Sequence, residues 1–218
     1  MARALDRFLR RYTSLSSVLN TLANRKIVLL SPSEWDDTND VHFMELYRSS
    51  VAAASVQAIC CTMSTETYHH WKVFTQGKDG VCIEFEREPL QTAVRNLPDI
   101  IAQPVEYLNV TDLENLGPGD IERLPFIKRE GFSDEREWRI VSKSQSEIRQ
   151  TLEISVELGW ITRLVLNPWM PPSLAKNLRS IIHRMPECGS MKIEASALTN
   201  SKRWKAAGDA LAFPQQPN

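Results

Sequence analysis

The sequence has little of what would assign a function by composition alone. It contains only 4 cysteines, 8 glycines and 12 prolines in 218 residues, and its formal net charge is −1. These values exclude a collagen-like, a disulfide-framework and a largely disordered protein, and the near-zero charge excludes a uniformly basic nucleic-acid coat. With 42% hydrophobic residues, a chain of this length is expected to bury a substantial core.

Long apolar runs are also missing. The N-terminal segment MARALDRFLRRYTS contains none long enough for a signal peptide, and the longest apolar stretches, 51–54 and 56–61, are far shorter than a membrane span. We therefore expect a cytoplasmic protein without a membrane partner.

Several common motifs are absent. There is no glycine-rich dinucleotide loop, no phosphate loop and no G-x-S-x-G segment, which disfavours a doubly wound nucleotide-binding fold and a serine hydrolase. Cys60 and Cys61 are adjacent, the other two cysteines are isolated, and their spacing to His69 and His70 matches no usual zinc site. We expect reduced cysteines and no bound metal.

The near-zero total charge hides an uneven distribution. Residues 1–30 carry a net charge of +5, residues 31–162 carry −11, and residues 163–205 carry +6. Ordinary solvated surface charge is one interpretation; a phosphate site built from both basic flanks is the other.

The hydrophobic pattern predicts an α+β fold in a single domain over residues 1–205, followed by a flexible tail over 206–218. The expected strands are Lys26–Leu30, Val56–Met63, Val81–Phe85, Pro104–Leu108, Glu137–Val141, Leu152–Val156, Ile161–Leu166 and Met191–Ala195. Helices are expected after the cap Ser14, after Asn39 or Asp40, over Thr65–Phe74, after Pro89, near Asp120–Arg129 and from Pro171 to about Arg184. Because the later strands cluster, we expect a mixed or antiparallel sheet with flanking helices.

The densest group of candidate catalytic residues is the segment DEREWRIV, residues 134–141. In a strand, Glu135, Glu137 and Arg139 would share one face. Two carboxylates so placed repel, which raises one pKa unless a cation intervenes, and such a pair suits charge stabilisation or general-base catalysis. The alternative is an edge strand whose carboxylates form structural bridges to Arg136, Arg139 or Lys143.

Three weaker patterns accompany this segment. Glu84 and Glu86, with Asp79 and Lys143, resemble the carboxylate and lysine set of a metal-dependent nuclease. The cluster Tyr68–Trp71 offers either a base with a stacking platform or ordinary core aromatics. Ser64 follows a predicted buried strand, where its hydroxyl would either orient a substrate or cap a helix.

Taken together, these elements resemble an uncharacterised prokaryotic family, the domain of unknown function numbered 2971, over about residues 8–190. The matching elements are Arg11-Tyr12-x-Ser14, the strand Ile27–Ser31, Ser31-Pro32 with Asn39-Asp40, Cys61-Thr62-Met63-Ser64, Trp71-x-x-Phe74, Gly80–Phe85 and Glu135-x-Glu137-Trp138-Arg139-Ile140. The chain departs from the family pattern at Val41, where proline is usual, and at Phe74, where tyrosine is frequent.

The order of these elements is also loosely similar to mono-ADP-ribosyltransferases of the Arg–Ser–Glu type. That resemblance implies that Arg11 holds the phosphates of NAD, with Tyr12 and Trp71 beside it, and that Ser64 orients the nicotinamide ribose. It also implies that Glu137 stabilises the oxocarbenium-like state while Glu135 orients or deprotonates the acceptor. Two assignments stay open: Arg10 competes with Arg11, and Thr62 and Thr65 compete with Ser64.

Three functional hypotheses follow. The first is an NAD-consuming transferase, a bacterial toxin or phage-defence effector whose acceptor is a protein or a nucleic acid. The second is a non-enzymatic sensor or partner-binding domain that uses Trp35, Trp71 and Trp138 for packing or docking. The third is a metal-dependent nuclease, which requires Glu84 or Glu86 to meet Glu135 or Glu137 around a metal-sized gap.

Overall fold

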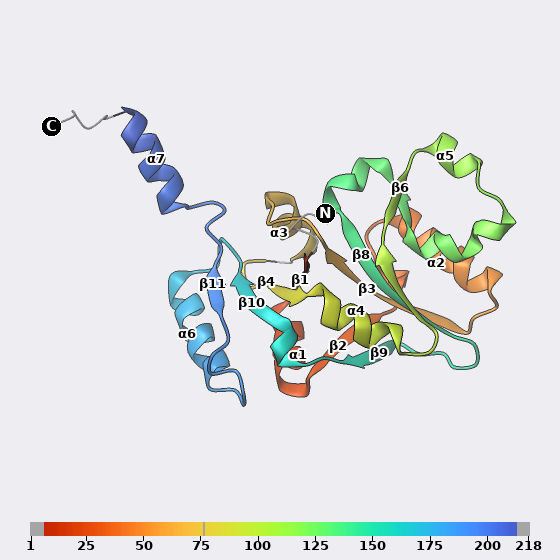
Figure 1. The fold of residues 1–218 in the computed structure, drawn as a ribbon, viewed down its shortest axis with the longest axis horizontal. Coiled ribbons are helices and arrows are strands. Elements are labelled where there is room, and N and C mark those ends of the chain that lie inside the picture. Colours follow the sequence, from red (N-terminus) through yellow and green to blue (C-terminus); the bar gives the residue numbers. More distant parts are fainter. Residues whose placement is uncertain (1–6, 76, 213–218) are drawn as a thin grey trace.

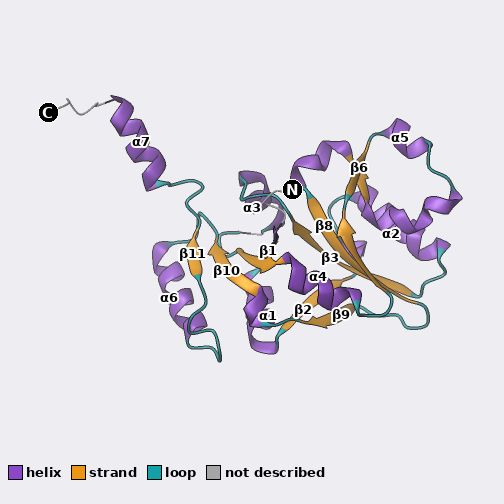
Figure 2. Cartoon of the chain, in the orientation of Figure 1, coloured by secondary structure: helices purple, strands orange, loops and turns teal. Residues whose placement is uncertain are grey.

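The computed structural model describes residues 7–75 and 77–212, and in this part of the chain strands and helices alternate before the strands cluster (Figures 1 and 2). The strands are β1 (Phe8–Thr13), β2 (Lys26–Leu30), β3 (Ser55–Thr62), β4 (Val81–Glu86), β5 (Ile100–Pro104), β6 (Glu106–Leu108), β7 (Ile127–Arg129), β8 (Glu137–Ser144), β9 (Thr151–Ser155), β10 (Ile161–Leu166) and β11 (Ile193–Ala195). The helices are α1 (Leu15–Asn24), α2 (Thr38–Ser50), α3 (Tyr68–Phe74), α4 (Arg87–Arg95), α5 (Val110–Glu114), α6 (Pro172–His183) and α7 (Lys202–Ala212).

Within the described residues, the strands form a nine-stranded sheet and a separate parallel pair, β6 with β7. The main order of the large sheet is β11-β10-β4-β1-β3-β2-β9, and β8 joins β3 to β5. Only β10 and β11 pair in parallel in this sheet; its other pairs are antiparallel. The predicted α+β class with a mixed, mostly antiparallel sheet and flanking helices is therefore confirmed.

The large sheet forks at β3. One edge of β3 pairs along its whole length with β8, while the other edge is shared by two strands. β1 pairs with β3 at Arg10 and Thr62, and β2 pairs with it at Leu30 and Ala58. The fork leaves the middle of β3, around Cys60, between β1 and β2.

Helices cover both faces of the sheet. On one face, α1, α4 and α6 bury Val18, Leu90 and Ile182 against the strands in the largest hydrophobic cluster. On the opposite face, α3 packs over β1, β4 and β10, whereas α2 and the 3₁₀ segment Pro118–Phe126 pack over β3 and β8. Apolar side chains alternate along the strands to supply both cores, as the pleat requires. The space between these two groups on the second face holds the polar residues described below.

The start of α1 is set by the predicted capping residue, whereas the start of α2 is set by a different one. Ser14 caps α1, accepting a hydrogen bond from the Ser17 amide at 3.2 Å. The cap of α2 is Asp37 rather than Asn39 or Asp40, and its carboxylate accepts from the Asn39 amide. Asp40 is thereby moved into the first turn, where it is buried.

Two further predictions of secondary structure were wrong. The helix expected near Asp120–Arg129 is a 3₁₀ segment that ends at Phe126 and is followed by β7, because Pro125 lacks the amide hydrogen that an α-helix needs. Glu135 does not lie in a strand: it ends the 3₁₀ segment Glu130–Glu135, and Arg136 adopts a left-handed conformation with φ of 41° before β8 begins.

At the C-terminal end, α7 extends away from the rest of the chain (Figure 1), and none of its residues is buried. It covers part of the segment for which we expected a tail, while residues 213–218 lie outside the described residues. No helix in the described ranges is both long and apolar enough to cross a membrane.

Candidate active site

Three polar residues lie in one row across neighbouring strands on the second face of the sheet. Arg10 on β1 is opposite Thr62 on β3, and Thr62 is opposite Glu137 on β8. Paired residues of antiparallel strands project to the same face, so the three side chains share one surface. This register brings Arg10 and Thr62 into line with Glu137. Arg10 is the alternative to Arg11 that the sequence left open, and Thr62 is one of the two alternatives to Ser64.

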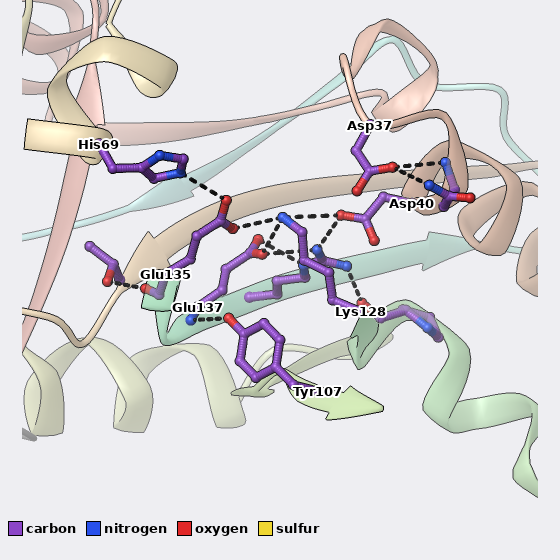
Figure 3. Close-up of polar contacts among 11 residues, drawn as sticks. Asp37, Asp40, His69, Tyr107, Lys128, Glu135 and Glu137 are labelled. Atoms are coloured by element: carbon purple, nitrogen blue, oxygen red, sulfur yellow. Dashed lines mark hydrogen bonds and ion pairs between the residues drawn. The ribbon is translucent and has the colours of Figure 1, made fainter. Parts of the chain in front are cut away.

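Glu137 is held by two cations. Arg139, two residues along β8, donates from Nε to Oε1 at 2.8 Å and from Nη2 to Oε2 at 2.9 Å (Figure 3). Lys128 Nζ on β7 lies 3.3 Å from Oε2. Burial by itself would raise the pKa of Glu137, but the charges and hydrogen bonds of Arg139 and Lys128 outweigh it, so the pKa falls to about 2. The carboxylate is therefore ionised at neutral pH.

Asp40 closes the network from the side of α2. Its Oδ2 accepts from Arg139 Nη2 at 2.6 Å and lies 3.6 Å from Lys128 Nζ. Burial raises the pKa of Asp40, and the two cations offset this only in part. Burial would lower the pKa of Lys128, but Glu137, Glu135 and Asp40 surround the ammonium and raise it instead. Lys128 is thus the cation that lies between the carboxylates.

Glu135 differs from Glu137 although the two are close. Its Oε2 accepts from Lys128 Nζ at 2.7 Å, and its Oε1 lies 3.5 Å from Nε2 of His69 on α3 (Figure 3). Burial raises the pKa of Glu135, and Lys128 compensates incompletely. The pair therefore combines one carboxylate with a low pKa and one with a raised pKa, the combination that suits charge stabilisation together with proton transfer.

Backbone contacts fix the segment that carries both carboxylates. The hydroxyl of Thr62 donates to the Glu135 carbonyl and accepts from the Ser64 amide at 2.9 Å. The hydroxyl of Ser64 donates to the Asp134 carbonyl at 2.9 Å, and the Glu137 amide donates to the Tyr107 hydroxyl at 2.7 Å. Ser64 thus supports the loop of Glu135, and Thr62 links that loop to the row.

A small cavity of about 110 Å³ collects these groups. Its lining residues are Arg10, Arg11, Tyr12, Cys60, Cys61, Thr62, Phe74, Glu135 and Glu137. Arg11 donates to the Cys60 carbonyl at 3.1 Å, where the sheet forks, and it also lines a second cavity of about 290 Å³ with the hydroxyl residues Thr13, Ser16 and Ser17. Arg11 is thus common to both cavities, and the 110 Å³ cavity alone is smaller than a typical ligand pocket of about 300–1,000 Å³.

The remaining predicted binding residues are less accessible. Trp71 is 1% exposed, donates from Nε1 to Glu66 at 2.6 Å and packs edge-on against the ring of Tyr12. Tyr12 lines the small cavity, but its ring belongs to the core beneath α3. Trp138 is fully buried, and Trp35 lies against the guanidinium of Arg139. Arg10 binds Glu84 and the Ser64 carbonyl, each at 2.8 Å.

The carboxylates proposed for a nuclease have other partners. Glu84 accepts from Arg10 and from Arg163, while Glu86 pairs with Arg7. Lys143 pairs with Glu122, not with Glu135 or Glu137. In the ranges that the structure describes, no group of three or more histidine, cysteine, aspartate or glutamate side chains is arranged to hold a metal ion.

Sequence reasoning missed three members of the network: Asp40, Lys128 and Tyr107. Asp40 was noted as a candidate helix cap and as part of the family pattern, not as a site residue, and Lys128 fell in a predicted helix where a lone lysine indicates a solvated face. The one signal available was the Asn39-Asp40 pair of the family pattern, since an aspartate that recurs beside a cap has some other partner.

Comparisons with known proteins bear on this site. The model of the family described as "Protein of unknown function (DUF2971)" matches residues 70–140, so the resemblance predicted from the sequence is confirmed for that stretch, which runs from His70 within α3 to Ile140 within β8. A search of curated proteins gives no significant match.

Solved structures of DarT from Thermus sp. 2.9 are similar to this chain. The complex with NAD+ has 8% identity and a TM-score of 0.43, covering 88% of this chain and 96% of that one. The complex with ADP-ribosylated ssDNA has 9% identity and a TM-score of 0.45, covering 88% and 94%; that with carba-NAD+ has 10% and 0.44, covering 88% and 96%. These values are too low to transfer a substrate or a mechanism to this chain.

Proposed function

We propose that this chain is an NAD-consuming transferase of the ADP-ribosyltransferase type, with a protein or nucleic-acid acceptor. The observation that carries the proposal is the convergence of Arg10, Thr62 and Glu137 in one row, with Glu135 and Arg11 lining the same cavity. In this proposal Thr62 takes the position first assigned to Ser64, and Ser64 supports the loop that carries Glu135.

Glu137 supplies the electrostatic part of the chemistry. When the bond between the ribose C1′ and nicotinamide breaks, its electron pair leaves with nicotinamide and positive charge develops on the ribose. A carboxylate that is already ionised and fixed by Arg139 and Lys128 stabilises that charge without rearranging. Arg139 and Lys128 use three acceptor sites of the carboxylate, and the side chain of the neighbouring Cys60 also hydrogen-bonds to it.

Arg11 supplies the anion-binding part. Its guanidinium lies at the fork of the sheet and faces both cavities, one lined by the two glutamates and the other by hydroxyl side chains. In the proposed complex the nicotinamide ribose occupies the smaller cavity and Arg11, at the edge of that cavity, contacts the diphosphate. An arginine beside two such cavities suits a diphosphate because guanidinium groups bind phosphate oxygens in a fork geometry.

The test is nicotinamide release from NAD, measured by chromatography with and without a bacterial lysate as the source of acceptor. The wild-type protein is expected to release nicotinamide, and Glu137→Gln is expected to lower the rate by at least about 10²-fold. The matched control is Glu122→Gln, because Glu122 is an exposed glutamate paired with Lys143 outside the site. Absence of release by the wild type under both conditions would overturn the proposal.

A further inference from the structure

His69 is partly open to solvent, unlike the carboxylate of Glu135 that it faces. Its side chain is 41% exposed, whereas that of Glu135 is 3% exposed. The atom Nε2 is nevertheless buried and has no hydrogen-bond partner in the free structure, with Glu135 Oε1 as its nearest acidic neighbour at 3.5 Å. The exposed surface of the imidazole therefore belongs to the other ring atoms.

Contacts on α3 fix the direction of this ring. It packs edge-on against Phe74, with ring centroids 6.3 Å apart, and Phe74 lines the small cavity together with Glu135 and Glu137. The neighbouring His70 faces inward: it is fully buried, its Nδ1 hydrogen-bonds to Thr67, and it stacks on Tyr12. Of the two adjacent histidines, His69 is thus the partly exposed one, and it contacts two residues that line the cavity, Phe74 and Glu135.

Glu135 is held in the position that orients such a ring. Lys128 binds its Oε2, which leaves Oε1 directed at His69 (Figure 3). A carboxylate next to one imidazole nitrogen favours the tautomer that carries its proton there, so the other nitrogen is an acceptor. Catalytic hydrogen bonds are often long in the free enzyme, and 3.5 Å is compatible with a contact that shortens when substrate binds.

We propose that His69, oriented by Glu135, is the general base that takes the proton of a neutral O–H or N–H acceptor as it attacks the ribose. This inference rests on the proposed transferase function and specifies the class of its acceptor. The acceptor oxygen or nitrogen forms the new bond to C1′, and the electron pair of the broken bond leaves with nicotinamide. The acceptor proton goes to His69 Nδ1, and Glu135 stabilises the resulting imidazolium.

The experiment compares a nucleophile that must lose a proton with one that has none to lose. Wild-type protein and His69→Gln are incubated with NAD in buffer containing sodium azide, and ADP-ribose and azido-ADP-ribose are quantified by chromatography. Water needs a base, and the azide anion does not. Because a general base contributes about 10²–10⁴-fold, His69→Gln is expected to raise the ratio of azide product to water product by about 10²-fold.

The product ratio does not depend on how much of the protein is folded or on its affinity for NAD, so a purely structural role of His69 would leave it unchanged. His183→Gln is the matched control, since His183 is an exposed histidine on α6, which packs on the opposite face of the sheet from α3, and its ratio should equal that of the wild type.

Three results would contradict the inference, and they can be told apart. An unchanged ratio in His69→Gln removes the base role and leaves the transferase proposal standing. Loss of both products in a variant whose urea denaturation midpoint equals that of the wild type assigns His69 to cleavage of the glycosidic bond instead. A wild-type protein that yields nicotinamide with neither nucleophile overturns the transferase proposal and this inference with it.

Discussion

Arg139 holds both carboxylate oxygens of Glu137, at 2.8 Å and 2.9 Å, from the same face of the same strand. Their side chains are only 1% and 6% exposed. Neither charged side chain could be buried to this extent without the other, because an unpaired buried ion costs several kcal/mol. The bridge therefore supports the fold and, at the same time, fixes the charged group on which the proposed chemistry depends.

Removal of this arginine is expected to destabilise the protein strongly. Arg139→Met leaves Glu137 and Asp40 buried with one fewer cation, and we expect a loss of about 3–5 kcal/mol in the free energy of unfolding, measured by urea denaturation. Arg149→Met is the control, because Arg149 pairs with Glu147 at the surface and its loss should cost about 0–1 kcal/mol. Similar small losses for both variants would contradict a structural role of the buried network.

The stability contributed by Glu137 is expected to disappear in acid. Its pKa in the folded protein is about 2, below the ordinary value of 4.5, so the folded state binds its proton less tightly than the unfolded state does. Its contribution is complete above about pH 4.5 and is lost as the pH falls toward 2, and the difference amounts to about 3 kcal/mol. Urea denaturation between pH 7 and 3 should show the advantage of the wild type over Glu137→Gln shrinking with acidity.

The stability contributed by Glu135 is expected to change with pH in the opposite direction to that of Glu137. Its pKa is raised by burial, so the folded state binds its proton more tightly, and protonation stabilises the fold as the pH falls through the raised value. The wild type should therefore gain stability relative to Glu135→Gln as the pH falls from the raised pKa toward 4.5, whereas it should lose stability relative to Glu137→Gln only below about pH 4.5. Parallel pH profiles for the two variants would show that the two carboxylates are not electrostatically distinct.

Much of the fold followed from local sequence patterns. The run Ser55–Thr62, the alternating strand Val81–Glu86 and the cap at Ser14 lie close to their predicted positions, because short-range periodicity and capping determine them. Pro125 was overlooked as a helix breaker, and Arg136 gave no warning of its positive φ, since arginine rarely adopts that conformation. As a result, Glu135 was expected to share a strand face with Glu137, although β8 begins only at Glu137.

The site was predictable in residue type but not in register. Whether Arg10 or Arg11 shares a face with Glu137 depends on which residues pair across β1, β3 and β8, and a shift of one residue reverses the answer. The contact of Asp40 with Arg139 joins residues 99 positions apart, and no local pattern encodes it. Long-range pairing of this kind becomes visible only once the chain is folded.

The Thr62 hydroxyl is expected to matter because it accepts from Ser64 and donates to Glu135. Thr62→Val keeps the shape but leaves that amide and that carbonyl without their partner, and we expect a loss of about 1–3 kcal/mol by urea denaturation together with slower nicotinamide release. Thr62→Ser retains the hydroxyl and should stay within about 1 kcal/mol of the wild type. Equal losses for valine and serine would mean that the methyl group, not the hydroxyl, stabilises this position.

Arg11 is expected to act on NAD binding. Replacing it with alanine removes the charge shared by the two cavities and should raise the KM for NAD by about 10-fold or more, with a smaller effect on kcat, if it contacts the diphosphate equally in the ground and transition states. Arg7→Ala is the control, since Arg7 lies at the surface and pairs with Glu86. A KM that is unchanged in Arg11→Ala would remove this residue from the binding site.

The C-terminal boundary of the folded domain can be tested by truncation, because α7 has no buried side chain whereas β11 buries Ile193. We propose that the folded unit ends before residue 206. The first truncated chain ends at residue 201 and therefore lacks α7, none of whose side chains is buried. Its thermal midpoint should lie within about 2 °C of the full chain, because surface changes alter stability by about 0.5 kcal/mol. A chain that ends at residue 190 also removes β11, which pairs with β10 and buries Ile193, and should be clearly less stable. A large loss already at residue 201 would mean that α7 is part of the folded domain.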